Sequence, residues 1–262
     1  MIAIVLLCRS RPPDHIISFY RQFIDQGYHV YLLPDAGDKL TEISGIQIIS
    51  IDDAVAAEAG YYDFTISFKK PSRAMAWDKA LYFFSRIESE YEYVWFIEDD
   101  VFIPSERILQ QIDLAHPTAD LISKDNIINT TGELDSWYWW KYVPSDLLPP
   151  PWSRSLVCAT RLSRKLLYCL DQLIITSGQM LHIDTAPLRS QPFRAPFIEF
   201  MFHTLSLARG LDIVTPKQLS HITWRREWKL NEISMDHITH PIKDFLLHEV
   251  IRTNNLDTDR TE

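Results

Sequence analysis

Short apolar runs alternate with longer amphipathic stretches along the N-terminal part of the chain. Runs of β-branched and aromatic residues predict strands, whereas stretches with apolar residues on one helical face predict helices. The predicted strands cover residues 2–7, 28–33, 46–51, 64–68 and 93–97, and the predicted helices cover residues 14–24 and 72–88 and begin again near Ser105. This alternation is typical of α/β proteins whose crossover helices connect parallel strands. We therefore predict an α/β fold with a central, mostly parallel sheet flanked by helices.

The pattern of the C-terminal part is less regular. It predicts strands at 119–122 and 155–160, loops at 137–140 and 149–152, and helices at 163–173, at 197–209 and from Pro241 onward. Pro241 suits a helix start, where the missing N–H of proline is not needed. The polar segment 253–262 is expected to be a flexible tail. No repeat or linker divides the chain, so a single domain at 1–252 is expected.

Composition narrows the classes of partner. A formal net charge of -9 argues against binding to nucleic acid, which usually needs a basic face. The cysteines, Cys8, Cys158 and Cys169, include no metal-type pair, and Cys8 and Cys158 lie in apolar runs, where a small core residue is expected. No segment has the length of a transmembrane helix or the flanks of a signal peptide. We expect no integral membrane segment and a cytoplasmic location.

Three consecutive carboxylates, Glu98-Asp99-Asp100, directly follow the apolar run 93–97. Ligands of open α/β sheets collect at the carboxyl ends of strands, and adjacent buried carboxylates require neutralisation. Their hard oxygen ligands suit Mg²⁺ or Mn²⁺, which can bridge the phosphates of a nucleoside diphosphate. The alternative is a solvated acidic loop that caps the next helix, and the tripeptide alone leaves both interpretations open.

The segment 93–102, YVWFIEDDVF, resembles the DxD-type metal-binding segment of GT-A glycosyltransferases. The upstream Lys79-Ala80-Leu81 and the downstream His240-Pro241-Ile242-Lys243 are similar to a helix and to a C-terminal His-containing segment of the same superfamily. The overall character is closest to glycosyltransferases of algae and large algal viruses. The resemblance implies a single GT-A-like (Rossmann-like) domain, with a nucleotide-sugar-binding half at about 1–125 and an acceptor-binding half at about 126–252.

The resemblance also implies a metal centre. Asp100 and His240 are the expected ligands, and Glu98 and Asp99 are expected beside the metal or the ribose. Glu98 departs from the commonest form, in which an aspartate stands at this position, so its contact with the metal stays open. A His-Pro pair alone is more typical of a helix start than of a ligand. The acidic turn and the resemblance together favour the ligand.

The donor implied by the resemblance is a nucleotide-sugar. Arg9 and Asp35 follow the first two predicted strands and, with Lys79 and Lys243, are the further candidates for binding it. Each of them alone is equally compatible with ordinary surface charge. Family frequency favours a UDP-sugar, such as UDP-xylose or UDP-glucose, and a glycan or glycoprotein acceptor. The expected enzyme is a hexosyl- or pentosyltransferase.

Transfer with inversion needs a carboxylate that takes the proton of the acceptor hydroxyl. Glu199, near the start of an apolar helix, is the first candidate, and Asp184 is the second. A first-turn glutamate that complements the helix dipole is an equally good interpretation of Glu199. Trp139 and Trp140 are candidates for stacking on an acceptor sugar, although aromatic residues at this density pack into a core more often.

Other functions use some of the same features. A sugar nucleotidyltransferase also needs a metal and an α/β sheet, but it is expected to have a glycine-rich phosphate loop after the first strand, and residues 8–13 contain no glycine. A noncatalytic carbohydrate-binding protein uses aromatic residues without an acidic turn. A glycoside hydrolase needs a pair of carboxylates that flank the sugar.

Overall fold

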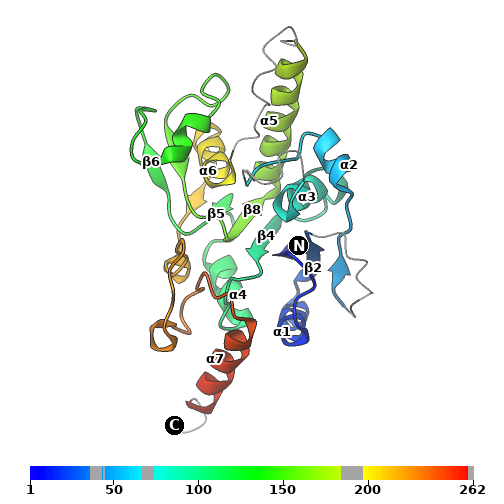
Figure 1. Cartoon of the computed structure of the whole chain (residues 1–262), viewed down its shortest axis with the longest axis vertical. Helices are drawn as coiled ribbons and strands as arrows, with labels where there is room; N and C mark the ends of the chain where they lie inside the picture. The colour runs from blue at the N-terminus through cyan, green and yellow to red at the C-terminus, as the bar shows by residue number, and fades with distance from the viewer. Residues whose placement is uncertain (36–42, 44, 66–73, 184–196, 259–262) are drawn as a thin grey trace.

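The computed structural model in Figure 1 describes residues 1–35, 43, 45–65, 74–183 and 197–258. Its centre is a seven-stranded sheet with the strand order β3-β2-β1-β4-β8-β5-β9. These strands are β1 (Ile2–Cys8), β2 (His29–Pro34), β3 (Gln47–Ile48), β4 (Tyr93–Glu98), β5 (Leu121–Ile122), β8 (Ala159–Ser163) and β9 (Ile213–Val214). All neighbouring pairs are parallel except those of β8, which runs antiparallel to both β4 and β5. The predicted α/β fold with a mostly parallel sheet is confirmed.

Helices cover both faces of this sheet (Figure 1). One face packs against α1 (Asp14–Asp25) and α4 (Glu106–Ala115). The other packs against α3 (Ala76–Tyr82), α5 (Arg164–Ile183) and α6 (Ile198–Ala208), while α2 (Asp53–Glu58) lies beside α3. The chain continues from α3 through one π-helical turn, η1 (Phe83–Ile87). The C-terminal helix α7 (Phe245–Thr258) contacts α1.

The central strands are apolar throughout because both of their faces are buried. In β1, Ala3, Val5 and Leu7 belong to the core on the α3 side, whereas Ile4 and Leu6 belong to the core on the α1 side. The residues of β4 alternate in the same way. Such uninterrupted apolar runs are expected of strands in a covered parallel sheet, and this explains why the sequence pattern locates β1 and β4 well.

A second, smaller sheet lies beside α6. It pairs β6 (Ile127–Asn129) with β7 (Trp152–Arg154) in antiparallel fashion. The 3₁₀ turn η2 (Tyr138–Tyr142) lies between these strands in the sequence, and the further short turns are η3 (Lys217–Leu219) and η4 (Leu230–Glu232). β7 packs closely against α6, so the first turn of α6 lies next to this aromatic region.

A buried charge network ties β8 to α4. Arg161, with no exposed surface, places Nη1 2.5 Å from Asp113 Oδ1 and donates from Nη2 to the carbonyl of His116. Asp113 also accepts hydrogen bonds from the Tyr28 hydroxyl and the Trp95 indole. The ionised pair is therefore held by several additional hydrogen bonds, as a buried pair requires.

Several predicted boundaries differ from the observed ones. The strand expected at 155–160 begins only at Ala159, and the helix expected to end at residue 173 continues to Ile183. The helix expected from Pro241 begins at Phe245, because residues 239–242 instead make extended contacts with the segment after β4. It continues to Thr258, into the segment expected to be a tail. Of the strand expected at 64–68, residues 64 and 65 form a turn and the others lie outside the described residues.

Among the described helices, none is both long enough and apolar enough to cross a membrane.

Candidate functional site

The acidic turn lies where the parallel strands end together. The register of β1 with β4 and β2 brings the residues after all three strands to one edge of the sheet. The backbone N–H of Arg9 donates to Asp99 Oδ2 at 3.2 Å, and the N–H of Asp35 donates to the carbonyl of Cys8 at 2.6 Å. Residues that are distant in sequence therefore surround the turn at the position where α/β sheets bind ligands.

Backbone pairing holds His240 against the same turn. Thr239 and Phe102 exchange two N–H to carbonyl hydrogen bonds, at 2.8 and 3.0 Å, and the N–H of Ile242 donates to the carbonyl of Asp100 at 2.7 Å. The His240–Pro241 peptide is cis. His240, which lies 142 positions after Glu98 by subtraction of the residue numbers, is thus fixed beside the acidic turn by main-chain contacts.

The side chains of this group face one another. His240 Nε2 lies 3.2 Å from Asp100 Oδ1 and 3.9 Å from Glu98 Oε2. The other oxygen of Glu98, Oε1, accepts a hydrogen bond of 2.8 Å from the indole of Trp77 on α3. One carboxylate oxygen of Glu98 is therefore held by the protein, and the other points toward the imidazole.

The orientation of the imidazole is set by its second nitrogen. His240 Nδ1 lies 2.9 Å from the carbonyl oxygen of Thr223, and because that oxygen can only accept, Nδ1 carries the proton. The carbonyl of His240 in turn accepts from the N–H of Thr223 and from the indole of Trp228. Metal-bound histidines are usually oriented by a hydrogen bond of this kind from the nitrogen that does not bind the metal. The arrangement leaves Nε2 directed at the carboxylates.

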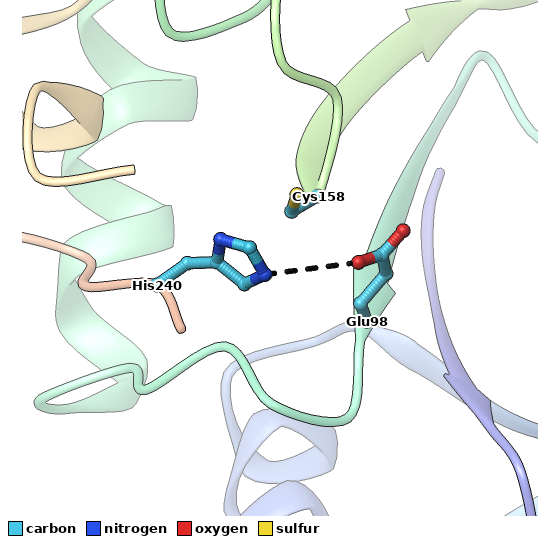
Figure 2. A group of neighbouring side chains, drawn as sticks. All are labelled: Glu98, Cys158 and His240. Atoms are coloured by element: carbon cyan, nitrogen blue, oxygen red, sulfur yellow. Dashed lines mark ion pairs between the residues drawn. The ribbon is translucent and has the colours of Figure 1, made fainter. Parts of the chain in front are cut away.

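Cys158 completes the group from a third direction. It precedes β8, and its carbonyl accepts the N–H of Glu98 at 2.9 Å. Its Sγ, a carboxylate oxygen of Glu98 and a ring nitrogen of His240 all lie within 4.8 Å of one another (Figure 2). The sequence pattern places Cys158 in an apolar run and predicts a core residue, so its presence in the site is not anticipated.

The electrostatics of the turn favour a bound cation. Burial raises the pKa of Glu98 and of Asp99, so their charged forms are disfavoured. Burial also acts to raise the pKa of Asp100, but the hydrogen bond and charge of His240 outweigh it and lower the pKa. Conversely, burial acts to lower the pKa of His240, and Asp100 and Glu98 outweigh it and raise the pKa. A divalent ion would relieve this excess of negative charge.

The donor set fits a divalent metal. Asp100 and Glu98 supply carboxylate oxygens, and His240 supplies a ring nitrogen whose partner nitrogen is already satisfied by Thr223. Mn²⁺ accepts both carboxylate and imidazole ligands, and Mg²⁺ accepts the carboxylates. These residues could therefore hold either ion.

The group opens into a cavity with a volume of ≈ 790 Å³. Of the residues predicted from the sequence to form the site, the cavity is lined by Arg9, Glu98, Asp100, Glu199, His240, Lys243 and Trp139. The metal-ligand candidates, the first candidate base and one candidate acceptor contact therefore share a single cavity.

Other predicted site residues do not line this cavity. Lys79 is only 3% exposed, and its Nζ lies 2.5 Å from Asp53 Oδ1 and 3.2 Å from the carbonyl of Asp35. It therefore ties α3 to its neighbours and is not placed to bind a ligand in the cavity, which corrects the expectation. The side chain of Asp35 is buried as well. Asp184 lies outside the described residues.

Asp99 and Trp140 are also absent from the cavity lining. Asp99 points back to the N–H of Arg9 and so ties the acidic turn to the end of β1. Trp140 is 1% exposed and packs against Trp137 and Trp152, with ring centroids 4.6 and 5.9 Å away. The expectation that Trp140 contacts an acceptor is therefore wrong, because the residue is part of the core.

Glu199 lies in the first turn of α6 and is partly buried. Burial, opposed in part by the charge of Arg154, raises its pKa from 4.5 to about 7. A carboxylate with this pKa can take up a proton near neutral pH, which suits a general base.

An aromatic wall lies beside Glu199. Trp137, Tyr138, Trp139 and Phe197 line the cavity, and the rings of Trp139 and Phe197 are 4.9 Å apart. The guanidinium of Arg154 lies 4.8 Å from the ring of Trp137. Ring faces that line a cavity can stack on the C–H faces of a sugar. Trp137 belongs to the aromatic loop that the sequence suggests as an acceptor platform, whereas Arg154 and Phe197 are residues of the cavity that the sequence pattern does not indicate.

Comparisons with known proteins give weak similarities. No protein-family model and no curated protein sequence matches the chain. Among solved structures, it is similar to mouse xyloside xylosyltransferase 1 in its apo form, with 11% identity, a TM-score of 0.38, and coverage of 82% of this chain and 84% of that one. It is also similar to an active-site mutant of LgtC, with 10% identity, a TM-score of 0.44, and coverage of 92% and 85%.

A third similarity is to a protein of different activity. The 4-diphosphocytidyl-2C-methyl-D-erythritol synthase from Anaerococcus prevotii shares 8% identity at a TM-score of 0.41, over 97% of this chain and 96% of that one. TM-scores of 0.38 to 0.44 are too low to transfer a function. The function is therefore argued from the geometry of the site.

Proposed function

We propose that the protein is a metal-dependent glycosyltransferase that moves a sugar from a nucleotide-diphosphate donor to a glycan hydroxyl with inversion. The observation that carries the proposal is the convergence of Glu98, Asp100 and His240 on one cavity that also contains Glu199. A cation site and a carboxylate with a raised pKa are the two parts that this reaction requires. UDP-xylose and UDP-glucose are the first donors to test.

Asp100, His240 and Glu98 would hold Mn²⁺ or Mg²⁺. When bound, the ion neutralises the diphosphate and stabilises the charge that develops on it as it leaves. Trp77 and Thr223 orient Glu98 and His240 through hydrogen bonds, so the ligands are arranged before the ion and the donor arrive. Preorganised ligands lower the reorganisation needed on binding.

Cationic side chains at the cavity supply the remaining contacts to the donor. Arg9 follows β1, Arg225 lies between η3 and η4, and Lys243 lies shortly after His240. All three line the cavity together with Glu98, Asp100 and His240. Guanidinium and ammonium groups form strong, charge-assisted hydrogen bonds with phosphate oxygens. They would bind the diphosphate that the carboxylates alone repel.

Glu199 would act as the base. Its carboxylate accepts the proton of the acceptor hydroxyl as the hydroxyl oxygen forms a bond to the anomeric carbon. The bond from that carbon to the nucleoside diphosphate breaks on the opposite face, so the configuration inverts. Trp139 would stack on the acceptor sugar and hold its hydroxyl near Glu199.

A screen of nucleotide-sugars with Mn²⁺ tests the proposal. Cleavage of one donor to its nucleoside diphosphate, accelerated by a glycan acceptor, is expected in the wild type. Asp100→Asn and His240→Gln should abolish it while the circular dichroism spectrum stays unchanged. Asp146→Asn, which removes an exposed carboxylate that does not line the cavity, is the matched control and should keep the wild-type rate. Full activity of Asp100→Asn or His240→Gln would refute the assignment.

The same screen separates the competing functions. A sugar nucleotidyltransferase would consume a nucleoside triphosphate and release pyrophosphate. The loop between β1 and α1 contains no glycine and so lacks the phosphate-binding loop that such an enzyme is expected to have. Metal-independent glycan binding without turnover would indicate a noncatalytic carbohydrate-binding protein, and glycan cleavage without nucleotide would indicate a hydrolase.

A further inference from the structure

The centre contains a soft donor atom beside the hard ones. Carboxylate oxygens suit Mg²⁺ and Mn²⁺, whereas a thiol adds nothing to the binding of these ions. Cys158 nevertheless places its Sγ within 4.8 Å of both a carboxylate oxygen of Glu98 and a ring nitrogen of His240 (Figure 2). A cysteine, a histidine and a carboxylate are the ligands that Zn²⁺ prefers.

Hydrogen bonds of the protein orient two of these donors, and backbone pairing places the third residue beside them. The Glu98 N–H binds the carbonyl of Cys158, the indole of Trp77 binds the far oxygen of Glu98, and Thr223 binds the far nitrogen of His240. Ligand atoms around a tetrahedral zinc ion lie roughly 3.5 Å apart. His240 Nε2 and Glu98 Oε2 are 3.9 Å apart, and the three ligand atoms lie within 4.8 Å of one another, so side-chain rotations that shorten these distances by up to about 1 Å would close the set.

We propose that Glu98, Cys158 and His240 form a second metal-binding set, specific for Zn²⁺ and similar soft divalent ions, within the centre that holds the catalytic ion. The two sets share Glu98 and His240, so they cannot be filled at the same time. Zn²⁺ is therefore a competitor of Mn²⁺ and Mg²⁺ at this centre.

The competing ion would also hinder the donor. Three protein ligands leave a tetrahedral ion with one free position, whereas chelation of a diphosphate by two of its oxygens takes two positions. An octahedral Mn²⁺ or Mg²⁺ ion with the same number of protein ligands leaves more positions open. Zn²⁺ is accordingly expected to inhibit turnover, and this consequence alone rests on the proposed function.

Cobalt spectroscopy tests the sulfur ligand directly. The protein is freed of metal with a chelator and titrated with Co²⁺, which substitutes for Zn²⁺ and gives a near-ultraviolet charge-transfer band when a thiolate binds it. The band is expected in the wild type and in Cys169→Ser, in which the half-buried cysteine of α5 is replaced. It is expected to be absent from Cys158→Ser and Cys158→Ala, two variants chosen in case one fails to fold.

Competition binding gives the size of the effect. Loss of a group that only supports a metal ligand weakens affinity 10- to 100-fold, so loss of Cys158 itself should weaken Zn²⁺ binding by at least ~10-fold. Mg²⁺ binding should stay unchanged in Cys158→Ser. A wild-type Co²⁺ complex without the thiolate band, or a band that persists in folded Cys158→Ser, would overturn the proposal.

Activity measurements then separate this inference from the proposed function. Zn²⁺ should inhibit Mn²⁺-supported donor cleavage, and Cys158→Ser should require at least ~10-fold more Zn²⁺ for the same fractional inhibition of its own rate. Turnover with Mn²⁺ but no thiolate band refutes the zinc set and leaves the glycosyltransferase proposal standing. A thiolate band in a protein that cleaves no nucleotide-sugar supports the zinc set and refutes the proposed function.

Discussion

Ionised Glu199 should destabilise the folded protein above about pH 7, the range in which it can act as a base. Burial raises the pKa of this carboxyl from 4.5 to about 7 in the folded protein. Replacement by glutamine keeps the shape of the side chain and removes the charge. We predict that Glu199→Gln is more stable than the wild type above neutral pH and inactive as a transferase, a trade-off common at active sites.

The magnitude and its sign follow from proton linkage. Between pH 4.5 and about 7 the folded protein holds a proton that the unfolded chain has lost, so stability falls as pH rises through this window. Below pH 4.5 both states are protonated and the stabilisation is fully present. The difference between a pKa of 4.5 in the unfolded chain and about 7 in the folded protein corresponds to about 3 kcal/mol. The variant should gain up to this amount relative to the wild type.

Urea unfolding from about pH 5 to about pH 8, in the presence of a chelator, measures the difference. Burial also raises the pKa of Asp78 to about 7, but this carboxyl is present in both proteins and its contribution cancels. Glu227→Gln, at an exposed position, is the matched control and should follow the wild type at every pH. Parallel stability curves for Glu199→Gln and the wild type would refute the raised pKa and, with it, the argument for a base at this position.

The remaining predictions concern the rate, the core and the acceptor. The transfer rate at low substrate should fall as pH drops below about 7, because Glu199 must be ionised to accept a proton, and a flat profile from pH-dependent kinetics would contradict this. Arg161→Met should lower the free energy of unfolding in urea by about 3–5 kcal/mol, because it leaves the charge of Asp113 buried without its partner. A loss below about 1 kcal/mol would contradict a stabilising role of the pair. Trp140→Ala should lower the free energy of unfolding by about 3–5 kcal/mol in the same assay, because Trp140 is buried in the core. Trp139→Ala should mainly raise the KM for the acceptor, because Trp139 lines the cavity. Equal effects of the two substitutions on KM would contradict this assignment.

The part of the fold that the sequence predicts best is the part that is buried on both sides. β1 and β4 are apolar in an unbroken run because helices cover both faces of the sheet, and such runs need no tertiary information to be recognised. Residues 155–158 look equally strand-like, yet they form the loop before β8. Their backbone groups bind Glu98 and Glu199 rather than a neighbouring strand, and nothing local in the sequence indicates this.

The candidate site likewise contains residues that the sequence indicates and residues that only the structure reveals. The acidic turn is recognisable because carboxylates at the end of a buried strand are unusual, and His240 because of its resemblance to a metal-binding segment. Lys79 is misassigned because its charge suggests a ligand contact, while its position among buried residues of α3 reflects an ion pair with Asp53. Cys158 carries no signal of its own, since an apolar cysteine is usually a core residue and only the antiparallel pairing of β8 with β4 brings it to Glu98.

Asp100 and Glu199 line the same cavity, come from different halves of the chain, and have pKa values shifted in opposite directions. His240 holds the pKa of Asp100 low, so this group stays ionised and can bind a cation at any physiological pH. Burial in the first turn of α6 holds the pKa of Glu199 high, so this group can exchange a proton. Carboxyl groups whose environments separate their pKa values in this way take different roles in one reaction. Burial raises the pKa of Glu98 and Asp99 in the acidic turn as well, but Glu98 faces His240 and Asp99 accepts the N–H of Arg9, so both belong to the cation site. Glu199 combines a raised pKa with a position on the aromatic side of the cavity, and this is why a carboxylate outside the acidic turn is assigned as the base.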